Sequence, residues 1–255
     1  MSPSSYESHQ SLPHGDCQIT HKSSGEHDMI DVDVLHSVSA IGTQILLTHN
    51  NEHALVDVGD GTVRDLVSRN VDFERIKGIL LTHEHFDHFS GLYGFLHFCR
   101  LLRRKEQLIL IVPRPARIVT SLLKPPVMYE PLPFQVRLIE LGESESTPIG
   151  ELEATAFSVE HGSANAFGYS IRDRQGFRVV VSGDTLSCKS LEHNVEGADV
   201  AVLEATYDDD HEDLALKYGH MTTSQALAVG KEAKRTILVH SNPDYYFQKF
   251  QCAVR

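Results

Sequence analysis

The chain has 255 residues and a mass of 28.5 kDa, which suits one domain with a full core or at most two small ones. A net charge of −12 argues against the broad basic surface typical of nucleic-acid binders, and no apolar run approaches the roughly 18–20 residues that span a membrane. The four cysteines are widely spaced without a Cys-x-x-Cys pair, as is typical of reduced thiols in an intracellular, cytoplasmic protein.

Apolar periods predict strands and helices that alternate in both halves of the chain. Residues 1–28 show no such period and are predicted to form a disordered N-terminal tail. The predicted strands are 30–35, 44–48, 54–58, 79–82, 108–112, 134–141, 152–159, 166–171, 177–181, 200–203 and 236–239, and the predicted helices are 63–70, 89–104 and 222–233. This order predicts an α/β sandwich of two sheets faced by helices, in one domain at 29–245 followed by a C-terminal tail at 246–255.

The segment Thr82-His83-Glu84-His85-Phe86-Asp87-His88 follows the apolar run Ile79-Leu80-Leu81. Imidazole and carboxylate are ligands that zinc and similar divalent metals prefer. The His-x-His alternation places two imidazoles on one side of an extended segment, and Asp-His at the following turn can face a second ion about 3.5–4 Å away. With 16 His in the chain a chance cluster is the alternative, but the spacing and the preceding strand favour a dinuclear metal centre.

Three later residues each follow the end of an apolar strand, as the first cluster does. They are His161 after 154–159, Asp184 after 177–181 and His240 after 236–239. Sites in α/β folds gather at strand ends, because loops converge there while the sheet holds them rigid. The candidate metal ligands are therefore His83, His85, Asp87, His88, His161, Asp184 and His240.

In the order and spacing of these motifs the chain resembles the metallo-β-lactamase superfamily, from about residue 30 to 246. The resemblance implies an αββα sandwich of two mixed β-sheets and two divalent metal ions, zinc in the first place with manganese as the alternative. It places His83, His85 and His161 on one metal, Asp87, His88 and His240 on the other, and Asp184 between both, with Asp57 supporting the site from behind the ligands. Flavodiiron relatives usually carry Glu at position 85, so His85 favours zinc and hydrolysis.

Two further segments resemble the ribonuclease Z branch, whose members trim the 3′ end of precursor tRNA. They are Leu203-Glu204-Ala205-Thr206 and Gly219-His220-Met221-Thr222-Thr223. The resemblance implies a metal-dependent phosphodiesterase in which a metal-bridging hydroxide attacks the phosphorus and Asp87 orients the water or takes its proton. His220, paired with Glu204, would act at the leaving oxygen. The structural alternatives are that Glu204 is an ordinary surface carboxylate and that His220 is a helix-start residue, with Thr222 or Thr223 as the helix cap.

Ribonuclease Z generally carries a basic flexible arm between its single His and its bridging Asp. Only 22 residues separate His161 from Asp184 here, and one predicted hairpin fills them, so this chain lacks the arm. The only basic cluster, at 100–105, is predicted to lie late in a helix. The expected substrate is RNA in the form of precursor tRNA, or a small phosphodiester, and a homodimer is expected because such relatives often dimerise.

Two alternatives to ribonuclease Z activity stay open from the sequence. The first is a small-molecule hydrolase of the same fold, acting on a cyclic phosphodiester or, like glyoxalase II, on a thioester or lactone. The second is a catalytically weak RNA- or protein-binding relative, suggested by the missing arm. An intact set of seven ligands argues against the second alternative.

Overall fold

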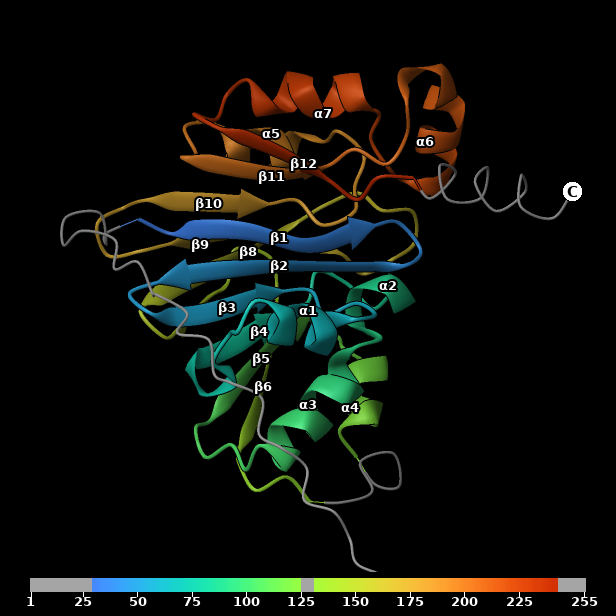
Figure 1. Ribbon diagram of the computed structural model, residues 1–255. Helices are drawn as coiled ribbons and strands as arrows, with labels where there is room; N and C mark the ends of the chain where they lie inside the picture. The colour runs from blue at the N-terminus through green and yellow to red at the C-terminus, as the bar shows by residue number, and fades with distance from the viewer. Residues whose placement is uncertain (1–28, 125–130, 243–255) are drawn as a thin grey trace, which may run out of the picture.

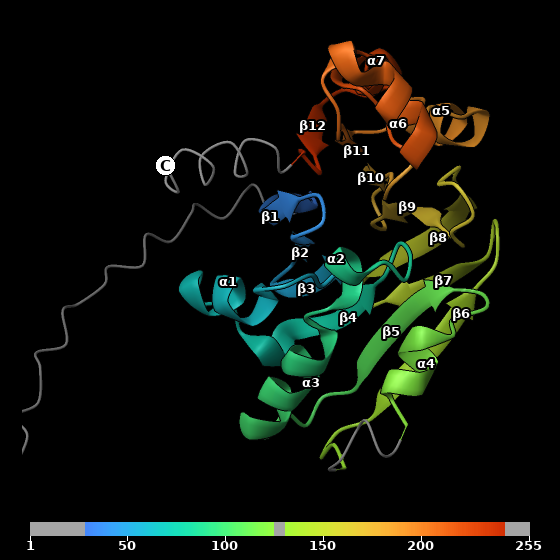
Figure 2. The same ribbon diagram turned by 90° about the vertical axis from the view of Figure 1, so that its right-hand side faces the viewer.

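Two six-stranded β-sheets pack face to face, with helices on the outer side of each (Figure 1, Figure 2). The computed structural model describes residues 29–124 and 131–242; both predicted tails, 1–28 and 246–255, lie outside these ranges, as do residues 243–245 of the predicted domain. Strand order is β1-β2-β3-β4-β5-β6 in the first sheet and β12-β11-β10-β9-β8-β7 in the second. Each sheet contains both parallel and antiparallel pairs, which confirms the predicted αββα sandwich of mixed sheets.

The strands and helices have the following bounds. The first sheet comprises β1 (Asp31–Val38), β2 (Gly42–His49), β3 (Glu52–Val56), β4 (Ile76–Leu80), β5 (Leu108–Pro113) and β6 (Val136–Leu141). The second comprises β7 (Ser146–Ile149), β8 (Leu152–Ser158), β9 (Phe167–Arg172), β10 (Arg178–Val181), β11 (Val200–Glu204) and β12 (Thr236–Val239). The helices are α1 (Thr62–Ser68), α2 (Phe86–Phe89), α3 (Leu92–Leu101), α4 (Ile118–Leu122), α5 (Lys189–Val195), α6 (Glu212–Tyr218) and α7 (Thr223–Gly230).

Buried apolar side chains form three layers that follow from this stacking. The central layer lies between the sheets and includes Leu47, Val56 and Tyr169. An outer layer under α1, α3 and α4 includes Phe95, and another under α5 and α7 includes Leu191. Strand β2 is buried along almost its whole length because both of its faces are covered, so its apolar run shows no alternation.

The predicted helix at 89–104 is wrong at both ends. The chain forms a one-turn helix, α2, before a break, and α3 ends at Leu101. Beyond it, Arg103 takes a left-handed backbone conformation (φ 58°) and Arg104 turns inward, where it is 1% exposed. Its guanidinium donates to the backbone carbonyls of Phe73 and Ile76. The basic cluster at 100–105 is therefore neither wholly helical nor wholly on the surface.

The other predicted elements are present, with ends that differ by at most three residues from the predicted ones. The sequence analysis did not predict β7, α4, α5 or α6, each of which has seven residues or fewer and so shows too little apolar periodicity. Across residues 29–124 and 131–242, no helix combines the length and apolar character needed to cross a bilayer.

Candidate metal centre

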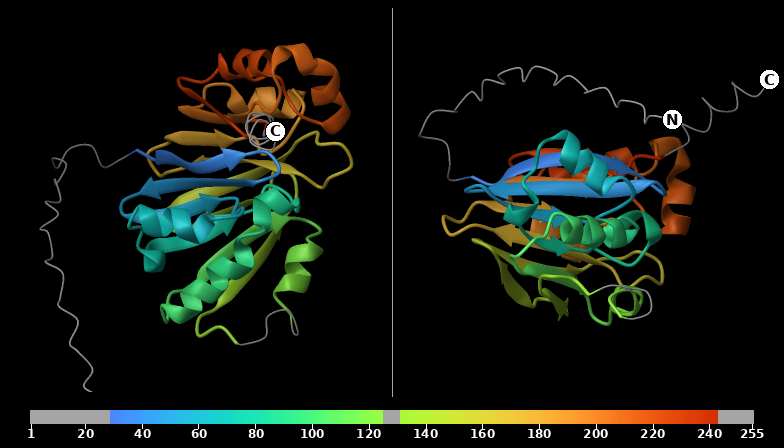
Figure 3. Two further views of the ribbon diagram at one scale, coloured as in Figure 1. Left: turned by 45° about the vertical axis from the view of Figure 1, so that its right-hand side comes forward. Right: turned by 60° about the horizontal axis from the view of Figure 1, so that its bottom comes forward.

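The candidate ligands come together at one end of the sandwich because each follows a strand that ends there. Asp57, His83, Asp184 and His240 follow β3, β4, β10 and β12, and His161 follows β8. In the first sheet, β3 and β4 pair in parallel. In the second sheet, β10 and β12 each pair in parallel with β11, and β8 runs in the same direction as β10 because both pair antiparallel with β9. The carboxyl ends of these strands therefore share an edge of their sheet. Helices α2 and α6 lie at this same end (Figure 1, Figure 3).

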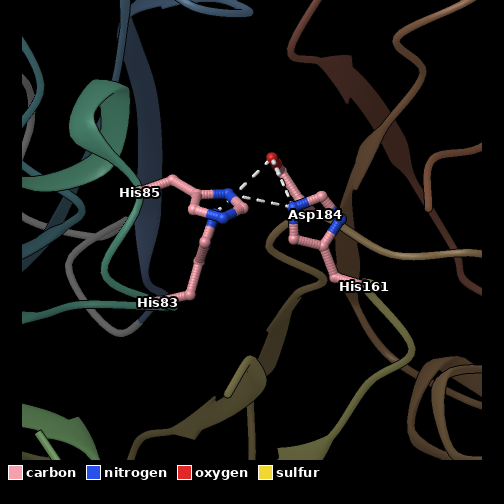
Figure 4. Close-up of side chains that lie close together, drawn as sticks. All are labelled: His83, His85, His161 and Asp184. Carbon is pink, nitrogen blue, oxygen red and sulfur yellow. Dashed lines mark hydrogen bonds and ion pairs between the residues drawn. The ribbon is translucent and has the colours of Figure 1, made fainter. Parts of the chain in front are cut away.

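One group of potential ligand atoms comes from His83, His85, His161 and Asp184, and these atoms lie within 4.8 Å of one another (Figure 4). His161 Nε2 is 3.1 Å from His85 Nδ1. The Oδ2 atom of Asp184 lies 3.7 Å from His83 Nε2 and 3.8 Å from His161 Nε2. His85 is the exposed member, while the other three are buried. The three imidazoles and one carboxylate thus enclose a single point.

A second group comprises Asp87, His88 and His240, again with ligand atoms within 4.8 Å of one another. His240 Nε2 is 3.3 Å from both His88 Nε2 and Asp87 Oδ2. Asp184 also reaches this group, with Oδ2 at 3.3 Å from His88 Nε2 and Oδ1 at 3.4 Å from His240 Nε2. The carboxylate of Asp184 therefore lies between the two groups, where the sequence analysis expected a bridging residue.

Four of the candidate histidines share one arrangement, in which a fixed oxygen contacts Nδ1 and leaves Nε2 facing the cluster. The pairs are His83 with Thr82 Oγ1 at 3.0 Å, His88 with Asp57 Oδ2 at 2.7 Å, His161 with the Gly219 carbonyl at 2.8 Å, and His240 with Thr206 Oγ1 at 2.8 Å. Such outer contacts fix the tautomer and the ring orientation of metal-binding histidines. Asp57 thus contacts His88 through Nδ1, the ring nitrogen opposite the one that faces the cluster.

The residues present fit a divalent metal. His83 Nε2 and Asp184 Oδ1 are buried and make no hydrogen bond to the described residues, which is costly for polar atoms without a ligand. The facing ring nitrogens at 3.1 and 3.3 Å match the separation of about 3.3 Å between two ligands on a tetrahedral zinc with bonds of about 2.0–2.1 Å. Imidazole and carboxylate are also the donors that zinc and manganese accept.

At four of the candidate ligands the electrostatics favour the deprotonated form, which donates electrons to a metal. Burial holds the pKa of His83 well below its ordinary value, and burial also lowers that of His85, so both rings are neutral at neutral pH. Burial by itself would raise the pKa of Asp184, but His240 and His88 outweigh it and hold this pKa well below its usual range. Burial is likewise outweighed at Asp87, where the hydrogen bond to His240 lowers the pKa to about 2.

Backbone geometry at the strand ends directs the side chains inward. Gly183, just before Asp184, has φ +62°, and a Cβ atom there would lie 2.8 Å from Cβ of Thr82, so only glycine fits without displacement. Asp57 and His240 have φ 60° and 61°, a left-handed conformation that is uncommon for residues other than glycine. Such strain collects at functional sites, where the surrounding structure stabilises it.

Glu204 and His220 form a buried pair beside the cluster. Glu204 is the last residue of β11 and is 1% exposed, so the surface-carboxylate alternative is wrong. Its Oε1 atom lies 2.9 Å from His220 Nδ1. Burial opposes protonation of His220, but the hydrogen bond and charge of Glu204 prevail and raise the pKa of His220. A third group of potential ligand atoms, from Asp184, His220 and His240, puts His220 within the same cluster.

The helix-cap alternative holds for Thr222 and coexists with this arrangement. Thr222 caps α7 in a capping box, accepting a hydrogen bond from Gln225 N and donating its own N–H to Gln225 Oε1. Thr223 is the first residue of the helix rather than its cap. The cap fixes the start of α7, and His220 lies two residues before Thr222 in the chain.

Sequence reasoning missed several residues that support the site. Thr82, Thr206 and Gly219 orient histidines, although each lies inside or beside a motif that the sequence analysis quoted. Glu84, between two candidate histidines, was not predicted to have a role. Its carboxylate accepts hydrogen bonds from the backbone N–H groups of Arg117 and Val119 at the start of α4. A Thr immediately after an apolar strand and next to a candidate ligand was the available signal.

This fold with its His/Asp cluster defines a metal-dependent hydrolase, and the chain belongs to the family described as "Beta-lactamase superfamily domain", whose model matches residues 55–241. Among curated relatives, it is 25% identical to ribonuclease Z of Archaeoglobus fulgidus over 82% of this chain and 84% of the relative. It is 27% identical to ribonuclease Z of Ignicoccus hospitalis over 75% and 79%.

Solved structures with the same fold include a tRNase Z. The human tRNase Z, short form, is 26% identical and superposes with a TM-score of 0.72 over 84% of this chain and 93% of that one. The metallo-β-lactamase fold protein YhfI of Bacillus subtilis has the same TM-score of 0.72, but its 20% identity speaks for the fold alone; it covers 84% of this chain and 87% of that one.

Proposed function

We propose that the protein is a ribonuclease Z-like phosphodiesterase that removes 3′ trailers from precursor tRNA. The observation that carries this proposal is that members of both His/Asp groups line one cavity of about 450 Å³ together with His220, which is paired with Glu204. The similarity to ribonuclease Z enzymes over most of both chains supports the same substrate class. The metal groups alone would serve many hydrolases, and the Glu204–His220 pair favours a phosphodiester.

In this proposal the site holds two divalent ions, zinc or alternatively manganese. His83, His85 and His161 would hold one ion, Asp87, His88 and His240 would hold the other, and Asp184 would serve both. Ions at such positions supply Lewis-acid activation of water and neutralise charge on the phosphate. Asp57 fixes the ring of His88 through Nδ1.

Two side chains would handle protons. Asp87 is ionised at neutral pH, and its Oδ2 atom accepts a hydrogen bond from the backbone N–H of Ala40 at 2.7 Å. The same carboxylate can accept a proton from, or orient, the attacking water. His220 has its Nδ1 held by Glu204 and a raised pKa, so its Nε2 can present a proton to the leaving oxygen. In this proposal Asp87 acts as the base and His220 as the acid.

The test is cleavage of a precursor tRNA bearing a 3′ trailer by the purified protein with Zn²⁺ or Mn²⁺. A single cut at the start of the trailer is expected, with loss of cleavage on adding a chelator and in Asp184→Ala. Asp31→Ala removes an exposed carboxylate on β1 and is the matched control. Cleavage of bis(p-nitrophenyl) phosphate or cyclic nucleotides without any cleavage of tRNA would contradict the tRNA assignment and favour a small-molecule hydrolase.

Only the hairpin of β9 and β10, flanked by short loops, connects His161 to Asp184, as expected from the sequence. In this proposal RNA is bound close to the metal centre or by another subunit. Homodimer formation and a cytoplasmic location stay predictions.

A further inference from the structure

The cavity at the candidate metal centre is also lined by residues that have no role in the proposed hydrolysis. Besides the metal-binding and catalytic candidates, Tyr207, Lys217 and Tyr218 line it. Lys217 is the only lysine or arginine among the described lining residues. Lys217 and Tyr218 are the last two residues of α6, which the sequence analysis did not predict. A cation and an exposed aromatic ring thus stand side by side at the entrance.

The end of α6 is fixed against the metal centre. Gly219 follows with φ +77°, and a Cβ atom on it would lie 2.8 Å from the backbone nitrogen of Gly162. The carbonyl of Gly219 accepts the Nδ1–H of His161, and His220 comes next in the chain. Lys217 and Tyr218 are therefore tied to residues of the site by a backbone that can shift little.

The start of α6 is also anchored, to α7. Asp209 accepts hydrogen bonds from the backbone N–H of Ser224 at 2.9 Å and from its hydroxyl at 2.5 Å. The side-chain amide of Gln225 donates to Glu212 at 3.1 Å. With both ends held, α6 presents Lys217 and Tyr218 as part of a pre-formed surface, which lowers the entropy lost when a ligand binds.

The two side chains have the chemistry of a nucleotide-binding site. Lys217 Nζ lies 4.9 Å from the ring centroid of Tyr218, and no carboxylate in the described part of the chain pairs with it. Tyr218 is 51% exposed, so part of its side-chain surface is accessible to a ligand. Proteins bind single-stranded nucleic acid with cations along the phosphates and aromatic rings against the bases.

Acidic residues at and before the start of α6 limit where an RNA strand can lie on this helix. The run Asp208-Asp209-Asp210 precedes the helix, and Glu212 and Asp213 form its first turn. These acids repel phosphates at the start of the helix, while Lys217 attracts them at its end beside the metals. In a chain of net charge −12 without an arm, this lysine is placed to hold the strand where it enters the site.

We propose that Lys217 and Tyr218 form a substrate subsite, in which the ammonium group contacts a phosphate next to the scissile one and the phenol ring stacks on a nucleobase. This deepens the proposed function and rests on it. The subsite would select an RNA strand over a diester that has no neighbouring nucleotides, because only a strand offers a second phosphate and a base.

The test compares Lys217→Gln, Lys217→Arg and Tyr218→Leu with Lys231→Gln, which removes the same charge from an exposed position at the end of α7. Thermal melting first checks that all variants fold. Steady-state kinetics on precursor tRNA over a series of salt concentrations gives KM, kcat and the salt slope. Anisotropy of a fluorescein-labelled RNA spanning the cleavage site measures binding without turnover.

We expect Lys217→Gln to raise KM and the dissociation constant for RNA about tenfold with a smaller change in kcat, and to reduce the salt slope by about 1. Tyr218→Leu should weaken binding about five- to tenfold without changing the salt slope. Lys217→Arg should bind like the wild type. For Lys217→Gln and Tyr218→Leu, kcat/KM should fall more for RNA than for bis(p-nitrophenyl) phosphate.

The outcomes separate this proposal from the proposed function. Cleavage of precursor tRNA with Lys217→Gln indistinguishable from Lys231→Gln in KM and salt slope would overturn the subsite and leave the function standing. RNA binding that depends on Lys217 in a protein that cleaves no tRNA would support the subsite and overturn the function. A wild type that neither binds nor cleaves RNA would overturn both.

Discussion

The Oε1 atom of Glu204 lies 2.9 Å from Nδ1 of His220, although 15 residues separate them along the chain. Backbone N–H groups of Thr185 and Thr206 also donate to the Glu204 carboxylate, which holds it in place. This contact turns a histidine near a helix start into a candidate proton donor with a fixed tautomer.

Glu204→Gln should lower kcat for tRNA cleavage by about 10²–10³, because His220 loses the charge that keeps it protonated. Glu204 raises the pKa of His220, so its loss lowers this pKa and the protonated form disappears at a lower pH. The alkaline limb of the kcat/KM profile should therefore move to lower pH. Glu196→Gln, on an exposed carboxylate after α5, is the control. An unchanged alkaline limb would show that His220 is not the acid.

Asp57→Asn should weaken one of the two proposed metal sites, that of Asp87, His88 and His240, by about tenfold to a hundredfold, because Asp57 contacts the ring of His88 at 2.7 Å. Zinc titration of the metal-free protein against a competing chelator measures both affinities. Asp60→Asn changes an exposed carboxylate three residues on and should leave both unchanged. Equal affinities in Asp57→Asn and the wild type would contradict the supporting role of Asp57.

Arg104→Met should lower the free energy of unfolding by about 2–4 kcal/mol, because several buried acceptors lose their donor. The guanidinium donates to the carbonyls of Phe73, Ile76, Glu106 and Gln107. Urea denaturation measures the change, and Lys105→Met on the exposed neighbour should cost much less. Equal losses in the two variants would mean that the buried guanidinium contributes no specific stability.

Cys99 should resist alkylation in the native protein. Burial raises the pKa of its thiol to about 12, so at pH 9 only about a thousandth is the reactive thiolate. Because the unfolded chain ionises at lower pH, the stability that this thiol contributes is lost as pH rises above its unfolded pKa of about 8.5. Iodoacetamide labelling followed by peptide mass spectrometry should find Cys99 modified only in urea; rapid native labelling would show that the α3 layer opens readily.

Sequence alone determined the fold class and the family, and it predicted which side chains come together at the candidate metal centre. Each candidate ligand follows a short apolar strand, and the carboxyl ends of strands that run in the same direction lie at one edge of their sheet. Local pattern and order were therefore enough to predict that these side chains meet. The ribonuclease Z resemblance came from the same kind of signal, a motif at a strand end and another at a helix start.

Only the tertiary structure decided what surrounds that cluster. The carbonyl of Gly219 holds His161 across 57 intervening residues, and Arg104 reaches carbonyls near residue 75, contacts that leave no period or motif in the sequence. Helix α6, with Lys217 and Tyr218 at its end, is too short for an apolar pattern and is held by bonds to α7. Strand ends are local events readable from the sequence, whereas the partners of a histidine's second nitrogen and the cation at the rim depend on how distant loops pack.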